Sequence, residues 1–141
     1  AIVSLTTAQR KARDTKRIAD VKQLQNAVEL YYSENAVYPL STTAINSTWA
    51  AFGTTVDSYI TNVPVDPTNT GTNVYTYGGI ATEYFIGAPL EDTAHSALNG
   101  DDETVYTVAG SWLALAPVTS DGVAAVSGGY TCVDPAYCVS E

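Results

Sequence analysis

The stretch that decides the fold is IADVKQLQNAVELY, at residues 18–31. Its apolar side chains recur at intervals of three, four and three residues, which is the spacing of one face of an α-helix. They are Val21, Leu24, Val28 and Tyr31. Neither glycine nor proline occurs in residues 1–38, and Pro39 follows directly after Tyr38. The pattern therefore predicts one long helix over residues 1–35.

The predicted helix is longer than the body that it joins. A helix of this length spans about 50 Å at about 1.5 Å per residue, whereas a compact chain of 141 residues is about 30 Å across. Between Gln9 and Arg17 only Ala12 is apolar. We therefore expect residues 18–35 to pack on a globular head of residues 36–141, and the N-terminal half of the helix to protrude as a stalk.

Beyond the helix, the apolar spacing changes to the alternation that is typical of strands. Residues 74–77 and 83–88 predict a hairpin, with a turn at Gly78-Gly79 and a stop at Pro89. Further strands are expected at residues 104–108 and 112–116, and an irregular region at residues 119–141. One long helix packed on a small antiparallel sheet is an α+β architecture.

The charges divide the chain into a basic stalk and an acidic head. The formal net charge is −9, and all 6 basic residues lie at or before position 22. Residues 1–22 also hold Asp14 and Asp20, so this segment carries +4, while the other 13 acids give residues 23–141 a charge of −13. An acidic head repels phosphate, which argues against nucleic-acid binding by the head. The basic residues are Arg10, Lys11, Arg13, Lys16, Arg17 and Lys22.

The two cysteines, Cys132 and Cys138, predict a disulfide. Two ligands cannot close a zinc site, and no histidine lies near them in the sequence. A disulfide implies export to an oxidising compartment. Two free buried thiols are the alternative.

No constellation of residues predicts an enzyme. The single histidine, His95, has Asp92 and Ser96 nearby in the sequence, but adjacency supplies neither the geometry nor the oxyanion site that hydrolysis needs. No cofactor is expected, with calcium as the one candidate ligand. Residues 91–103 form an acidic loop whose oxygens could bind calcium, and a solvated loop is the alternative. The candidate ligands are Asp92, Asn99, Asp101, Asp102 and Glu103.

Several stretches resemble type IV pilins and pseudopilins. ARDTKRIAD at residues 12–20 and LQNAVELYY at residues 24–32 resemble the amphipathic half of the pilin helix. NAVYP at residues 35–39 is similar to the helix exit, with Ala36 where the family has glycine, so Asn35 is expected to take the turn instead. VPVDP at residues 63–67, followed by YTY at residues 75–77, resembles the approach to the first strand in pilins and in the major pseudopilin of type II secretion.

The resemblance implies a structural subunit of a type IV pilus or a pilus-like filament, assembled through the N-terminal helix. The alternatives are the major pseudopilin of type II secretion, which binds calcium in a loop after the hairpin, or a monomeric secreted module that binds calcium or a glycan. The implied partners are copies of the chain, the assembly machinery, and the inner membrane, reached through an apolar arm that these residues lack. The protein would be exported, held in the inner membrane before assembly, and then placed in a periplasmic or cell-surface filament. All six basic residues would lie on the assembly helix. There they would face acidic heads of neighbouring copies, or else anionic lipid headgroups or solvent.

Overall fold

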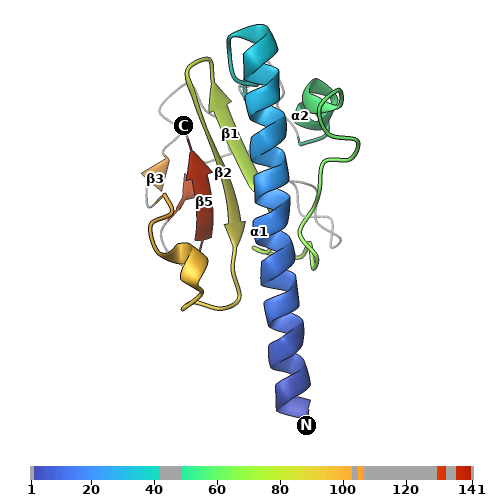
Figure 1. Cartoon of the computed structure of the whole chain (residues 1–141), viewed down its shortest axis with the longest axis vertical. Coiled ribbons are helices and arrows are strands. Elements are labelled where there is room, and N and C mark those ends of the chain that lie inside the picture. The colour runs from blue at the N-terminus through green and yellow to red at the C-terminus, as the bar shows by residue number, and fades with distance from the viewer. Residues whose placement is uncertain (1, 42–48, 103–104, 107–129, 133–135, 141) are drawn as a thin grey trace.

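The long helix lies across one face of a small antiparallel sheet, and its N-terminal end extends past the sheet (Figure 1). The computed structural model describes residues 2–41, 49–102, 105–106, 130–132 and 136–140. The α+β, pilin-like architecture predicted from the sequence is confirmed. The strand predicted at residues 112–116 lies outside the described residues.

Helix α1 (Ile2–Asn35) has 34 residues, close to the predicted bounds. Val21, Leu24 and Val28 are completely buried, which confirms the apolar face read from the sequence. This face packs mainly on the central strand of the sheet, β2. Within the described part of the chain, no helix combines the length and the apolar character needed to cross a membrane.

Helix α1 ends at Asn35 as predicted, but the left-handed turn is at Ala36 and not at Asn35. Asn35 still belongs to α1, and its side-chain amide donates a hydrogen bond to the carbonyl of Tyr31 (2.9 Å). Ala36 has a φ of 59°, in the left-handed region, and its N–H donates to the carbonyl of Tyr32 (2.8 Å). The prediction was wrong because that backbone hydrogen bond fixes the reversal one residue later, at a residue that pays a steric cost for it.

The main sheet contains β1 (Thr76–Ile80), β2 (Glu83–Pro89) and β5 (Ala136–Ser140), in the order β1-β2-β5 with both pairs antiparallel. A second ladder joins β3 (Val105–Tyr106) to β4 (Tyr130–Thr131). The short helices are α2 (Trp49–Val56) and the single 3-10 turn η1 (Ser96–Leu98). Regular structure therefore extends into the C-terminal region that was expected to be irregular.

The predicted hairpin is confirmed, but its turn is not at Gly78-Gly79. Ile80 pairs with Glu83, so the turn is the two residues between them, and both glycines lie inside β1. Each is required by close packing. A methyl group on Gly78 would collide with the ring of Phe85, and one on Gly79 with the hydroxyl of Tyr77 and the carbonyl of Pro39. A glycine in a strand here marks close approach by neighbouring groups and not a bend.

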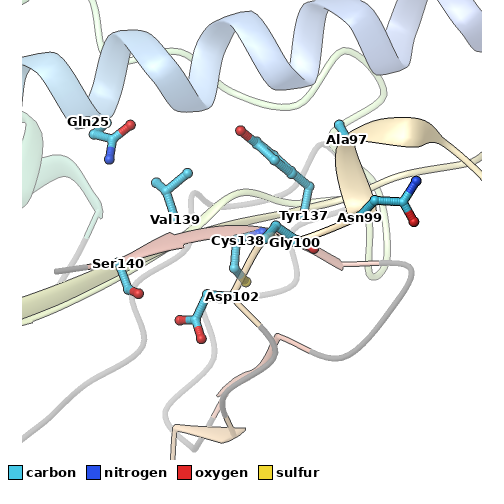
Figure 2. Close-up of a pocket in the computed structure, with 10 residues that line it drawn as sticks. Gln25, Ala97, Asn99, Gly100, Asp102, Tyr137, Cys138, Val139 and Ser140 are labelled. Carbon is cyan, nitrogen blue, oxygen red and sulfur yellow. Dashed lines mark hydrogen bonds between the residues drawn. The ribbon is translucent and has the colours of Figure 1, made fainter.

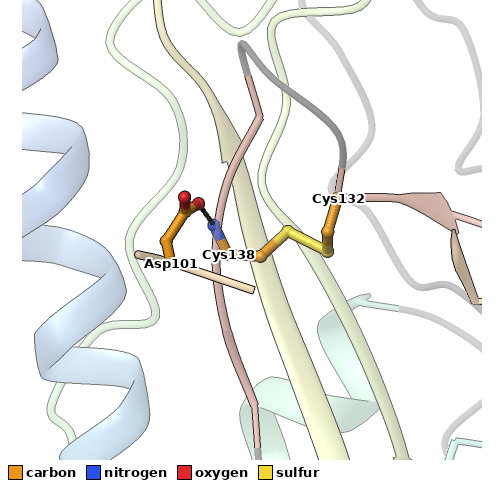
Figure 3. Close-up of a disulfide and its surroundings, with 3 residues drawn as sticks. All are labelled: Asp101, Cys132 and Cys138. Carbon is orange, nitrogen blue, oxygen red and sulfur yellow. Dashed lines mark hydrogen bonds between the residues drawn. A yellow bond between two sulfur atoms is a disulfide. The ribbon is translucent and has the colours of Figure 1, made fainter. Parts of the chain in front are cut away.

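The predicted disulfide is confirmed and ties β4 to β5. Cys132 and Cys138 are bonded, with an S–S distance of 2.06 Å, and both are almost completely buried. Figure 3 shows the bond together with the carboxylate of Asp101, which accepts a hydrogen bond from the N–H of Cys138 (2.9 Å). The disulfide and this hydrogen bond hold β5 between β2 and the loop that follows η1.

Candidate functional site

The N-terminal part of α1 is exposed. Every side chain from Ser4 to Ala12 is exposed, and Leu5 exposes 61% of its surface. Figure 1 shows this segment extending beyond the end of the sheet, away from the head. A helical segment whose side chains are all exposed is available for contact with other molecules.

Just above this segment, a buried arginine joins the helix to the head. Arg17 is completely buried. Its Nε donates to Oδ2 of Asp66 (2.7 Å) and its Nη2 to Oδ1 of the same carboxylate (3.0 Å), which is a bidentate pair. Asp66 lies in the extended VPVDP segment, so the pair links residues 49 positions apart.

Asp14 completes the neutralisation of Arg17 and also holds a loop. Its Oδ1 accepts a hydrogen bond from Nη1 of Arg17 (2.8 Å). Its two oxygens also accept the backbone N–H groups of Glu91 (3.0 Å) and Asp92 (2.9 Å). One carboxylate on α1 thereby fixes the start of the loop after β2.

Arg13 and Glu91 form a second bidentate pair at the edge of this cluster. Nε and Nη2 of Arg13 donate to the two carboxylate oxygens of Glu91, at 2.8 and 3.1 Å. Glu91 also lies 3.3 Å from Nη1 of Arg17. We call the five side chains the ion-pair cluster: Arg13, Asp14, Arg17, Asp66 and Glu91.

The cluster shifts the ionisation of its members. Burial opposes ionisation of Asp66, but hydrogen bonds from Arg17 and Thr68 outweigh it and hold the pKa of that carboxyl below its usual value. The hydrogen bond from Arg13 lowers the pKa of Glu91. Burial also works against the charge on Arg17, yet its hydrogen bonds to Asp66 and Asp14 raise the pKa of the guanidinium. All three groups are therefore charged at neutral pH.

One turn further along α1, Asp20 makes a smaller polar contact with the head. Its Oδ2 accepts hydrogen bonds from the hydroxyl of Tyr75 and from Nζ of Lys16, both at 2.7 Å. Burial, and then the hydrogen bond to the Asp20 carboxylate, raises the pKa of Tyr75. Lys16 keeps more than half of its side chain exposed.

The structure divides the six predicted assembly residues into two groups. Arg13, Lys16 and Arg17 form ion pairs within the chain. Arg10, Lys11 and Lys22 are exposed and form no ion pair with any described residue. Contact with the head also begins at Arg13 and not at Ile18, where the sequence placed it. The apolar pattern could not predict this earlier contact, because charged side chains make it. The spacing of Asp14 and Arg17 by three residues, one helical turn, was the available signal.

The candidate calcium ligands do not converge. A hollow of about 540 Å³ lies beside β5. Figure 2 shows that the side chains of Asn99 and Asp102, which line it, point in different directions. Asp92 accepts the N–H of Ala94, and Asp101 accepts that of Cys138. Among the described residues, no three acidic, histidine or cysteine side chains are grouped as a metal site. Glu103 lies outside those residues, so calcium binding stays a prediction.

His95 has a local structural contact. Its Nδ1 accepts a hydrogen bond from the backbone N–H of Ala97 (3.0 Å), which caps the short helix η1. This contact orients the loop between β2 and Asp101.

A comparison of the sequence with models of protein families shows which family has this arrangement. Residues 4–101 match the model for type II secretion system (T2SS), protein G, the major pseudopilin. The chain belongs to this family. The match to protein G covers α1 from Ser4 onward, the whole ion-pair cluster and the hairpin, and it ends before β3, β4 and β5. Searches of the curated proteins and of the solved structures found no match.

Proposed function

We propose that this protein is the structural subunit of a pilus-like filament of type II secretion, assembled through helix α1. The exposed segment from Ser4 to Ala12 carries the proposal, because the ion-pair cluster next to it holds the helix on the head while the side chains of the segment stay exposed. Copies of the chain that pack side by side would cover it. The head would then form the outer layer of the filament.

Family membership favours the secretion filament over a surface pilus. The sequence pattern alone left both readings open and placed the pilus first. The match to protein G supports the second reading. The disulfide agrees with an exported protein of the cell envelope, since such bonds persist in oxidising compartments. Anchoring in the inner membrane before assembly belongs to the same proposal.

A monomeric secreted module is the rival from another class. It would use the hollow beside β5 or exposed aromatic side chains to bind a ligand, and it would leave the N-terminal part of α1 without a role. A bulky charged residue on that segment would therefore prevent assembly of a filament subunit, but it would not affect a monomeric module.

The test compares two alanines that are both exposed on helices. Ala8 lies on the protruding segment of α1, and Ala50 lies on α2 in the head. The complete gene product is expressed in the cells that make it, and filaments are pelleted and counted by electron microscopy. We expect Ala8→Arg to abolish filaments and Ala50→Arg to retain them, with both isolated domains melting like the wild type. Equal filament yield from Ala8→Arg and the wild type would contradict the proposal.

A further inference from the structure

The protruding segment carries two exposed basic side chains that do not belong to the ion-pair cluster. Arg10 and Lys11 line a hollow of about 250 Å³ between α1 and the loop after β2. Its other lining residues are Thr7, Glu91, Asp92 and Thr93. Glu91 is already paired with Arg13, so two cations face the single charge of Asp92. We call this surface the basic hollow, and its remaining charge is positive.

Three exposed acids lie at the opposite end of the molecule. Glu34 is in the last turn of α1, Glu83 follows the turn between β1 and β2, and Asp57 follows α2. Tyr59 brings the segment after α2 to the end of α1, since its hydroxyl donates to Glu34 (2.6 Å). The N–H of Tyr38, just past α1, donates to the carbonyl of Ala81 in the hairpin turn (3.1 Å). Figure 1 shows α2, the hairpin turn and the end of α1 at the same end of the molecule. We call Glu34, Asp57 and Glu83 the acidic end.

Nothing in the sequence neutralises the acidic end from within. The chain has no lysine or arginine beyond position 22, and the cations before that position lie in the N-terminal two thirds of α1. The long axis of the molecule therefore has a basic surface at one end and an acidic surface at the other. Like ends of two copies repel each other, and unlike ends attract.

We propose that the basic hollow of one copy receives the acidic end of a second copy of this chain. This inference rests on the proposed function and specifies which surfaces meet in the filament. Arg10 and Glu34 are separated by 24 helical positions, so the two copies are offset by about 36 Å along the helix axis. The contact is heterologous, because the two partners use different surfaces. With an offset along the helix axis it cannot close into a ring, so it propagates into a filament.

The contact sets the register of the copies more than it sets their affinity. Exposed ion pairs contribute about 0–1 kcal/mol each and are screened beyond about 8 Å at physiological salt. Like charges placed opposite each other are costly. Assembly should consequently respond more strongly to reversal of the charges than to their removal.

Charge reversal and its rescue test the pairing. Arg10→Glu with Lys11→Glu is expected to lower filament yield about tenfold. Adding Glu34→Lys and Glu83→Lys to the same chain should restore most of the yield. Lys22→Glu is the matched control, because Lys22 is an exposed, unpaired cation on the same helix but outside the basic hollow. It should assemble like the wild type.

The outcomes separate this inference from the proposed function. Normal filaments from Arg10→Glu with Lys11→Glu, beside normal wild-type filaments, would overturn the pairing and leave the filament function standing. Failure of the four-fold variant to recover, with its isolated domain folded, would also overturn the pairing. Absence of wild-type filaments would overturn both.

Cysteine cross-linking gives a second measurement that does not depend on charge. Both natural cysteines are in the disulfide, so an introduced cysteine is the only free thiol. Filaments mixed from Lys11→Cys and Glu83→Cys chains should yield an oxidised dimer. Lys11→Cys mixed with Thr72→Cys, an exposed position outside the acidic end, should yield none. Equal dimer from both mixtures would show that the contact is not specific.

Discussion

Arg17 and Asp66 face each other with both side chains fully buried, and their Nε and Oδ2 atoms are 2.7 Å apart. This pair joins the middle of α1 to the segment that leads into β1. Two buried charges are stable together because each replaces the water that the other has lost. Neither can be removed alone without leaving an uncompensated charge in the core.

Arg17→Met should destabilise the isolated domain strongly. The substitution leaves Asp66 buried without its main partner, which typically costs about 3–5 kcal/mol. Urea unfolding monitored by circular dichroism measures the change. Lys22→Met, on the exposed side of the same helix, should change stability by no more than about 0.5 kcal/mol. Equal midpoints for the two variants would show that the ion-pair cluster is not important for folding.

Stability should fall in acid because of the same cluster. Asp66 and Glu91 have pKa values below their ordinary 3.8 and 4.5. A carboxyl with a lowered pKa in the folded state stabilises the fold above its unfolded pKa, and this contribution is lost as pH falls through the folded pKa. The melting temperature should therefore be flat near neutral pH and decrease from about pH 5 downward. Asp57→Asn, at an exposed site, should keep this acid dependence, whereas Asp66→Asn should weaken it.

Ala36→Gly should stabilise the protein. Ala36 is exposed and has a φ of 59°, a conformation that costs a residue with a Cβ atom about 1–2 kcal/mol. Glycine removes that cost and loses part of the gain through unfolded-state entropy, which leaves a net gain of about 1 kcal/mol. Ala19→Gly, at an exposed position inside α1, should do the reverse and cost about 1 kcal/mol. Thermal unfolding of the pair measures both signs, and a loss at position 36 would contradict the assignment of the helix end.

Reduction of the disulfide should weaken the domain without dissolving the helix–hairpin unit. Cys132 and Cys138 close a short loop with a sequence separation of 6, and loss of such a cross-link costs about 2 kcal/mol in the chain-entropy model. Unfolding curves with and without a reductant measure the difference. Cys132→Ser with Cys138→Ser should match the reduced wild type and show no further response to reductant. A response in that variant would mean that the reductant acts elsewhere.

The apolar part of the fold could be predicted from the sequence, and the polar part could not. Val21, Leu24 and Val28 predict the buried face of α1, because the apolar residues that a helix buries recur at helical spacing. Arg17 and Asp14 have no apolar pattern, and their three-residue spacing does not by itself predict burial, since most charged residues at this spacing lie in solvent. Their burial depends on Asp66 and Glu91, which arrive from distant parts of the chain. The two halves of an ion pair can be matched only when the fold is known.

The same distinction explains the errors at the glycines and at the helix end. Gly78-Gly79 is a common turn dipeptide, and only the ring of Phe85 and the carbonyl of Pro39 reveal why β1 needs glycine there. Asn35 is the better residue for a left-handed turn, but the position of the reversal is fixed by backbone hydrogen bonding. Of the candidate site, the sequence located the exposed basic residues. It could not divide them into those used within the head and those left for a partner.

Strand β5 has a consequence for how the protein matures. It pairs with β2, yet residues 90–135 separate the two strands in the sequence. A pairing between such distant segments is slow, because the intervening chain must first be ordered. In a chain made from its N-terminus the hairpin therefore forms with one edge unpaired, and β5 covers that edge only after the intervening residues have been made. Cys138 belongs to β5, so its bond to Cys132 then keeps the covering strand attached to the segment before it.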